Sequence, residues 1–243
     1  MEEDIISFDK NITFYFNKQK ETRLFIKNLD DLYKKIHTIE DKEISKDSEY
    51  IKQRNPLDII MKCYAIESDI AISQKHLLLS TQEQEYIYFA KLICMTIHTG
   101  IDFIKNIMTY LKSHSDTRDI ELFTAKLGKI HKYKKMIDLI RDHSIAHIEP
   151  QFTTYYDSML NIFDIPFNEV VKDFIEVIQN IRELSYIINK SQLEKQRKYL
   201  KEISTHNINI IKNDTNLSNK QDLLRLYKEL DNLFCIENIN TKK

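Results

Sequence analysis

Residues 82–113, QEQEYIYFAKLICMTIHTGIDFIKNIMTYLKS, decide the fold class of this chain. Their apolar side chains recur at intervals of three and four residues, at Phe89, Ile93, Ile97, Ile101, Ile104 and Met108. This spacing places them on one face of an α-helix, so the segment predicts a long helix that faces a core. The stripe runs past Gly100, where we expect a close contact with another helix.

The rest of the chain has the composition of a helical protein. Its 243 residues include only 2 Gly and 3 Pro, whereas sheets need many turn residues, so the composition disfavours a many-stranded β architecture. Phosphate loops and dinucleotide fingerprints need several closely spaced glycines, and Gly100 and Gly128 each stand alone. A hydrophobic content of 42% is enough for a substantial core.

The helical pattern recurs on both sides of this stretch. Asn55 and Pro56 predict an N-cap and a first-turn proline, Pro150 forbids an easy continuation, and residues 151–165 are interpreted as a packed loop. The predicted helices cover residues 5–39, 56–79, 82–113, 117–146, 166–203 and 219–235, with polar connections around 40–55 and 205–218. We therefore expect an all-α fold, a single antiparallel bundle of about six mostly long helices. One domain would span residues 1–243, with 204–243 as a looser C-terminal appendage.

Charge and cysteine content bear on partners and on the compartment. With 36 basic and 37 acidic side chains, any contact with nucleic acid must be local. Cys63, Cys94 and Cys235 are far apart and odd in number, which is typical of reduced, buried thiols. The acidic N-terminus does not resemble a signal peptide, and we find no uncharged apolar run long enough to span a membrane. These observations predict a soluble, cytoplasmic protein.

The segment before Pro150, FTAKLGKIHKYKKMIDLIRDHSIAHIEP (residues 123–150), carries the candidate chemistry. Its apolar stripe runs through Ile130, Tyr133, Ile137 and Ile140, then becomes polar and reaches His147. Arg141 lies beside this stripe, and Lys134 lies seven residues before it on the same side of the helix.

The string RDHSIAHIE at residues 141–149 resembles the motif of the HEPN superfamily, in the version found in abortive-infection members. Family members have an arginine, usually followed by a polar residue, and a histidine after four to six intervening residues. Here Asp142 follows Arg141, and five residues separate Arg141 from His147. The resemblance implies a homodimer whose two motif helices line one cleft, with RNA cleavage in many members. It points to a toxin or phage-defence effector, with an antitoxin or defence-system partner.

These residue types suit RNA cleavage without a metal or a cofactor. Histidine transfers protons near neutral pH, and the planar fork of arginine holds phosphate oxygens and stays charged. We therefore predict Arg141 and His147 as catalytic, and a dimer would supply two of each. Candidate auxiliary residues are Asp142, His143 and Glu149, and candidate RNA-binding residues are Lys134 and Lys135. His143 is an additional imidazole within the motif.

Other interpretations of the same residues stay open. Arg141 could pair with Asp138 on its own helix, and His147 could be a core or capping histidine. His143 and His147, four residues apart, could share a metal ion with Glu149. The lysines near residue 132 could form an ordinary solvated face. At the level of function, the alternatives are a non-catalytic HEPN-like dimeric binding module and an unrelated helical scaffold.

Overall fold

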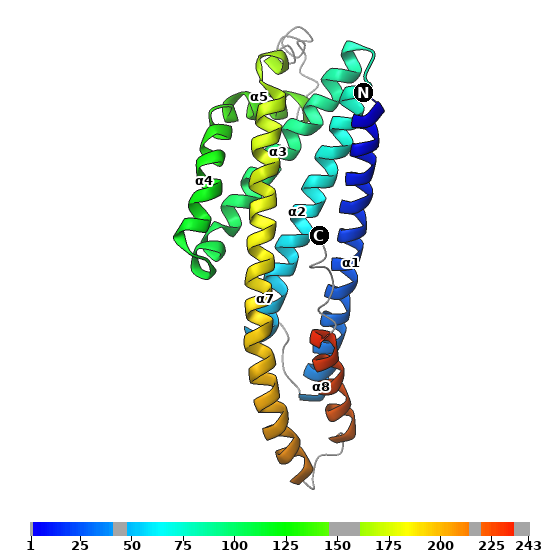
Figure 1. Cartoon of the computed structure of the whole chain (residues 1–243), viewed down its shortest axis with the longest axis vertical. Coiled ribbons are helices and arrows are strands. Elements are labelled where there is room, and N and C mark those ends of the chain that lie inside the picture. Colours follow the sequence, from blue (N-terminus) through cyan, green and yellow to red (C-terminus); the bar gives the residue numbers. More distant parts are fainter. Residues whose placement is uncertain (1, 41–47, 146–160, 214–219, 236–243) are drawn as a thin grey trace. The chain divides into compact units, whose positions relative to one another are not determined.

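The computed structural model describes residues 2–40, 48–145, 161–213 and 220–235. Of these residues 95% are helical, and none of them forms a strand. The predicted all-α helical bundle is therefore confirmed (Figure 1).

Seven α-helices and one 3₁₀ helix make up the described ranges. They are α1 (Glu2–Glu40), α2 (Ser48–Leu79), α3 (Glu83–His114), α4 (Thr117–His131), α5 (Lys134–Ile145), η2 (Asn161–Asp164), α7 (Phe167–Asn213) and α8 (Lys220–Cys235). The predicted bounds of α3 and α8 agree with the structure within one residue at each end.

The chain divides into two compact units. Unit 1 comprises residues 1–20 and 59–185, and unit 2 comprises residues 21–58 and 186–243. Helices α3, α4 and α5 lie wholly in unit 1 and α8 lies wholly in unit 2, whereas α1, α2 and α7 each contribute to both. The prediction of a single domain with a looser segment at 204–243 stays a prediction.

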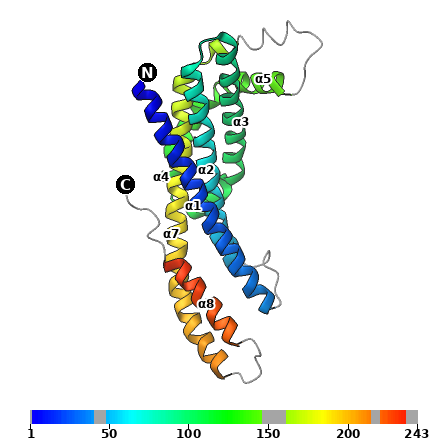
Figure 2. The same ribbon diagram turned by 90° about the vertical axis from the view of Figure 1, so that its right-hand side faces the viewer.

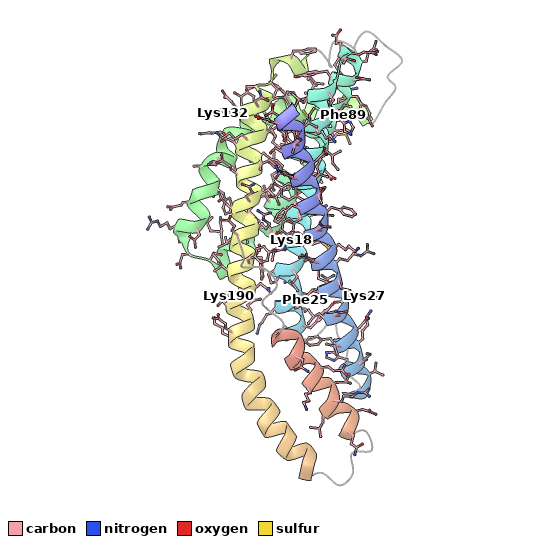
Figure 3. All side chains as sticks on the ribbon, turned by 45° about the vertical axis from the view of Figure 1, so that its right-hand side comes forward. Lys18, Phe25, Lys27, Phe89, Lys132 and Lys190 are labelled. Atoms are coloured by element: carbon pink, nitrogen blue, oxygen red, sulfur yellow. The ribbon has the colours of Figure 1, made fainter. Side chains whose placement is uncertain are left out.

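The helix predicted over residues 117–146 is interrupted. The N–H groups of Lys132 and Tyr133 bond to the carbonyls of Lys129 and Ile130, three residues back, and this tight turn separates α4 from α5. Figure 3 labels Lys132 at this junction. Helix α4 buries Phe123 and Ile130. After the break the chain changes direction, so that α5 crosses α3 and does not extend α4 (Figure 2).

Three further boundaries differ from the prediction. Helix α2 begins at Ser48, so Pro56 lies inside it, because its first turns pack on α1 within unit 2: the Tyr50 hydroxyl donates to Asp30 at 2.9 Å. Helix α7 continues to Asn213, since the polar residues after 203 include no glycine or proline that would end it. The predicted loop at 151–165 lies outside the described residues up to 160, and η2 occupies 161–164.

Helix α3 is the central element of unit 1. The middle of its predicted stripe is buried, with Ile93, Ile97, Ile101 and Ile104 all within the core, whereas Phe89 and Met108 at its two ends are half-buried. Gly100 faces α7 so closely that an added Cβ would lie 2.3 Å from Cζ of Phe174, which confirms the predicted close helix contact. By length and composition alone, α3 is also the one described helix that could cross a membrane, a property that core helices of globular bundles share.

Candidate functional site

Helices α3 and α5 bring two polar stripes together on unit 1. Each helix places three charged or titratable side chains at positions i, i+4 and i+7, which lie on one face of an α-helix. We call these six residues the His98 cluster: His98, Asp102 and Lys105 from α3, and Lys134, Asp138 and Arg141 from α5. The apolar residues Ile97 and Ile101 of α3 and Ile137 and Ile140 of α5 are buried, and the two helices lie in contact.

One side of the His98 ring is held by a carboxylate. Nδ1 of His98 lies 2.7 Å from Oδ1 of Asp138, while Nζ of Lys134 bonds to the other oxygen of the same carboxylate. Burial would raise the pKa of Asp138, but the hydrogen bonds from Lys134 and His98 outweigh burial and lower the pKa. Asp138 is therefore ionised at neutral pH and accepts a hydrogen bond from Nδ1–H.

The other ring nitrogen faces a donor and an acceptor. Nη1 of Arg141 donates to Nε2 of His98, and Oδ2 of Asp102 lies 3.2 Å from the same nitrogen. Guanidinium can only donate and an ionised carboxylate can only accept. In the neutral ring, Nδ1 therefore carries the proton toward Asp138, and Nε2 presents its lone pair toward Arg141.

The Nε2 side of the ring borders solvent. The His98 side chain is only 13% exposed, but Asp102 and Lys105 beside it are each 51% exposed. Nζ of Lys105 lies 3.2 Å from Oδ1 of Asp102. This hydrogen bond lowers the pKa of Asp102, and the charges of Lys105 and Lys134 act in the same direction.

The arrangement suits proton transfer better than metal binding. Asp138 and Asp102 lie at opposite nitrogens of the imidazole, so the three groups do not converge on one point. Within the described ranges, no group of three or more His, Cys, Asp or Glu side chains is placed to hold a metal ion. A histidine with one nitrogen bound to an aspartate and the other next to an arginine has the parts of an acid–base site.

The structure places the predicted site residues as follows. Arg141 lies in the His98 cluster, as does Lys134, which pairs with Asp138 on its own helix. Lys135 is exposed beside them. His147 and Glu149 lie outside the described residues, and so do the side chains of Asp142 and His143. The predicted catalytic role of Arg141 together with His147, and the alternative metal site at His143, His147 and Glu149, therefore stay predictions.

Sequence reasoning missed His98, Asp102 and Lys105. The available signal was the polar series His98, Asp102 and Lys105, which recurs at intervals of four and three residues along α3, the most apolar of the described helices. That series alone is also the pattern of a solvated helix face. Only its contact with α5 distinguishes the two, and the contact joins residues about forty positions apart.

Unit 1 contains a second polar group, which is buried. Glu67 of α2 is fully buried, and Arg182 of α7 pairs with it and also lies over the ring of Tyr64, 4.6 Å from its centroid. Oε1 of Glu67 has no hydrogen-bond partner among the described residues. This pair ties α2 to α7 inside the bundle, away from solvent, so it is structural in character.

No family model, no characterised protein and no solved structure matches the chain. The functional proposal below therefore depends on the residues of the His98 cluster and on the motif that begins at Arg141.

Proposed function

We propose that this protein is a metal-independent endoribonuclease of HEPN type that acts in the cytoplasm as a toxin or phage-defence effector. Arg141 stabilises the charge of the phosphorane, and His147 transfers a proton. A homodimer presents the two motif helices to each other, so that one cleft contains two copies of each residue. An antitoxin or another defence component would control the activity.

The observation that carries this proposal is the surroundings of Arg141. Its guanidinium lies beside the imidazole of His98, and a carboxylate fixes that imidazole from the opposite side. A phosphodiester bound by Arg141 would therefore lie next to a group that can transfer a proton, the His98 imidazole. Metal-free RNA cleavage needs this combination, because the phosphorane must be neutralised while protons move at two oxygens.

The direct test is cleavage of single-stranded RNA in EDTA. We expect products with 2′,3′-cyclic phosphate ends and no cleavage of DNA, which lacks the 2′-hydroxyl nucleophile. Arg141→Ala and His147→Ala should each lower kcat/KM by about 10²-fold or more. Arg118→Ala is the matched control, since Arg118 is an exposed arginine on α4 in the same unit. A requirement for a divalent metal, or full activity of both variants, would contradict the proposal.

The homodimer has a separate test. Sedimentation of the wild-type chain at tens of micromolar should give a dimer, and the Arg141→Ala variant should remain dimeric. A monomer that still cleaves RNA would show that the site does not need a second copy.

A non-catalytic interaction module is the second candidate, and one observation favours it. Arg141 is already engaged by His98, as expected for an arginine that holds α5 against α3. In that case Arg141→Ala would lower the melting temperature and leave RNA intact at every protein concentration. Stability and cleavage measured on the same preparation therefore separate the two functions.

A further inference from the structure

We propose that His98 is a further catalytic residue of the ribonuclease site, the general base that removes the 2′-hydroxyl proton through Nε2, with Asp138 as its positioning residue. This inference rests on the proposed function and adds to it a group from α3 that lies outside the HEPN-like motif.

The first support is the state of the imidazole. A base must be neutral and must offer a lone pair in a defined direction. The 2.7 Å contact of Nδ1 with Asp138 fixes the second condition, because in the neutral ring the ionised carboxylate accepts the Nδ1 proton and Nε2 keeps its lone pair. Lys134, one turn earlier on α5, donates a hydrogen bond to the same carboxylate. The ring therefore cannot turn without breaking a chain of two hydrogen bonds.

The second support is convergence. Nη1 of Arg141 points at the Nε2 lone pair, so the two groups that a phosphodiester needs are aimed at one location. When the guanidinium turns its donors to phosphate oxygens, Nε2 gives up that hydrogen bond and gains the adjacent ribose hydroxyl in exchange. The substrate thus replaces an interaction that already exists, and no rearrangement of α3 or α5 is required.

The chemical step balances with the groups named. The proton of the 2′-hydroxyl moves to Nε2 of His98 while the 2′-oxygen forms a bond to phosphorus. The bond between phosphorus and the 5′-oxygen breaks, and the leaving oxygen takes a proton from the acid, which is His147 in the proposed function. The products are a 2′,3′-cyclic phosphate and a 5′-hydroxyl end.

After this step both N–H groups of the His98 ring have an acceptor. Asp138 accepts from Nδ1 on one side, and Asp102, 3.2 Å from Nε2, can accept the new N–H on the other. Arg141 opposes the imidazolium as a neighbouring cation, but a bound phosphodiester offsets that repulsion. Lys134 and Lys105, the remaining cations of the His98 cluster, are each paired with one of the two carboxylates.

The experiment compares His98→Gln with His114→Gln in the full-length chain. Glutamine is close to histidine in size but is not a base. His114 lies in the last turn of α3, exposed, with Nδ1 2.9 Å from the carbonyl of Tyr110. We expect His98→Gln to lower kcat by about 10²- to 10⁴-fold. The acid limb of the pH–rate profile, which reports protonation of the base, should disappear. Binding of a 2′-O-methyl oligoribonucleotide, which cannot react, should stay within about twofold of wild type.

The outcomes separate the two proposals. If the wild-type protein does not cleave RNA in EDTA, the proposed function fails and His98 has no reaction to catalyse. If the wild type cleaves and His98→Gln keeps its rate and its acid limb, only the role of His98 is overturned. Should His98→Gln not fold, Asp138→Asn decides, because it keeps the shape of the side chain but can hold the imidazole in the other tautomer. We expect it to lower kcat with little change in RNA binding, and an unchanged rate overturns the inference.

Discussion

Nη1 of Arg182 lies 2.8 Å from Oε2 of Glu67, and the Glu67 side chain is fully buried. Burial raises the pKa of Glu67 to about 7, although the charge of Arg182 and a hydrogen bond with Gln179 act in the opposite direction. The Glu67–Arg182 pair thus couples the packing of α2 and α7 to proton binding.

We predict that stability falls as pH rises from about 4.5 to about 7. The folded protein keeps a proton on Glu67 in this range, whereas the unfolded chain has lost it, so proton release favours unfolding. The effect is on the order of 2–4 kcal/mol across the window. Urea unfolding at several pH values should show this slope, and Glu67→Gln should flatten it. The exposed Glu121→Gln is the control, and an identical slope in both variants would contradict the assignment.

The two glycines give a matched pair of substitutions. Gly100→Ala should destabilise the protein by about 1–3 kcal/mol, because the new Cβ would lie 2.3 Å from the fully buried ring of Phe174. Gly128→Ala should stabilise it by roughly 0.5–1 kcal/mol, since nothing lies within 4 Å and alanine is the better helix former. Thermal melts measure both. Equal effects of the two substitutions would show that the α3–α7 contact is looser than described.

Arg141→Lys should restore little of the activity lost in Arg141→Ala. A lysine keeps the charge but cannot donate two parallel hydrogen bonds to phosphate, and a preorganised donor is worth about 2.7–4 kcal/mol in the transition state. The measurement is kcat/KM for RNA cleavage, with binding of the 2′-O-methyl oligoribonucleotide as a parallel readout. If lysine restores wild-type kcat/KM, a point charge is sufficient and the bidentate role is wrong.

Cys63 and Cys94 should be unreactive in the folded protein. Both thiols are buried and free, and burial raises the pKa of each, that of Cys94 to about 12. In the Cys235→Ser variant we therefore expect no fast reaction with a thiol reagent until the protein is unfolded, when both react together. A fast-reacting thiol in the native variant would mean that unit 1 opens locally around α2 or α3.

The fold could be predicted from sequence where one face of a helix carries the signal. The stripe of α3 predicted both its length and its burial, and Gly100 within that stripe predicted the close helix contact. The break between α4 and α5 could not be predicted, because neither Lys132 nor Tyr133 is a residue that ends helices. Its cause is tertiary: α5 turns so that Ile137 and Ile140 become buried.

Only part of the candidate site could be predicted from the sequence, for a related reason. Arg141 belongs to a local motif, so its position in the sequence was enough to single it out. His98 is defined by what it contacts, and its partners Asp138 and Arg141 are 40 and 43 residues away. Spacing along one helix describes its faces and says nothing about which second helix will cover them.

Unit 1 and unit 2 are connected by continuous helices, and this limits where the chain can be truncated. The chain passes between the units at Lys20–Glu21, Asp58–Ile59 and Ser185–Tyr186, inside α1, α2 and α7. A cut at any of these places creates two helix ends, each with about four backbone N–H or C=O groups that lose their partners. Truncation or recombination must therefore keep both units or redesign three helix termini. Neither unit is available as a module that could be exchanged between proteins by joining loops.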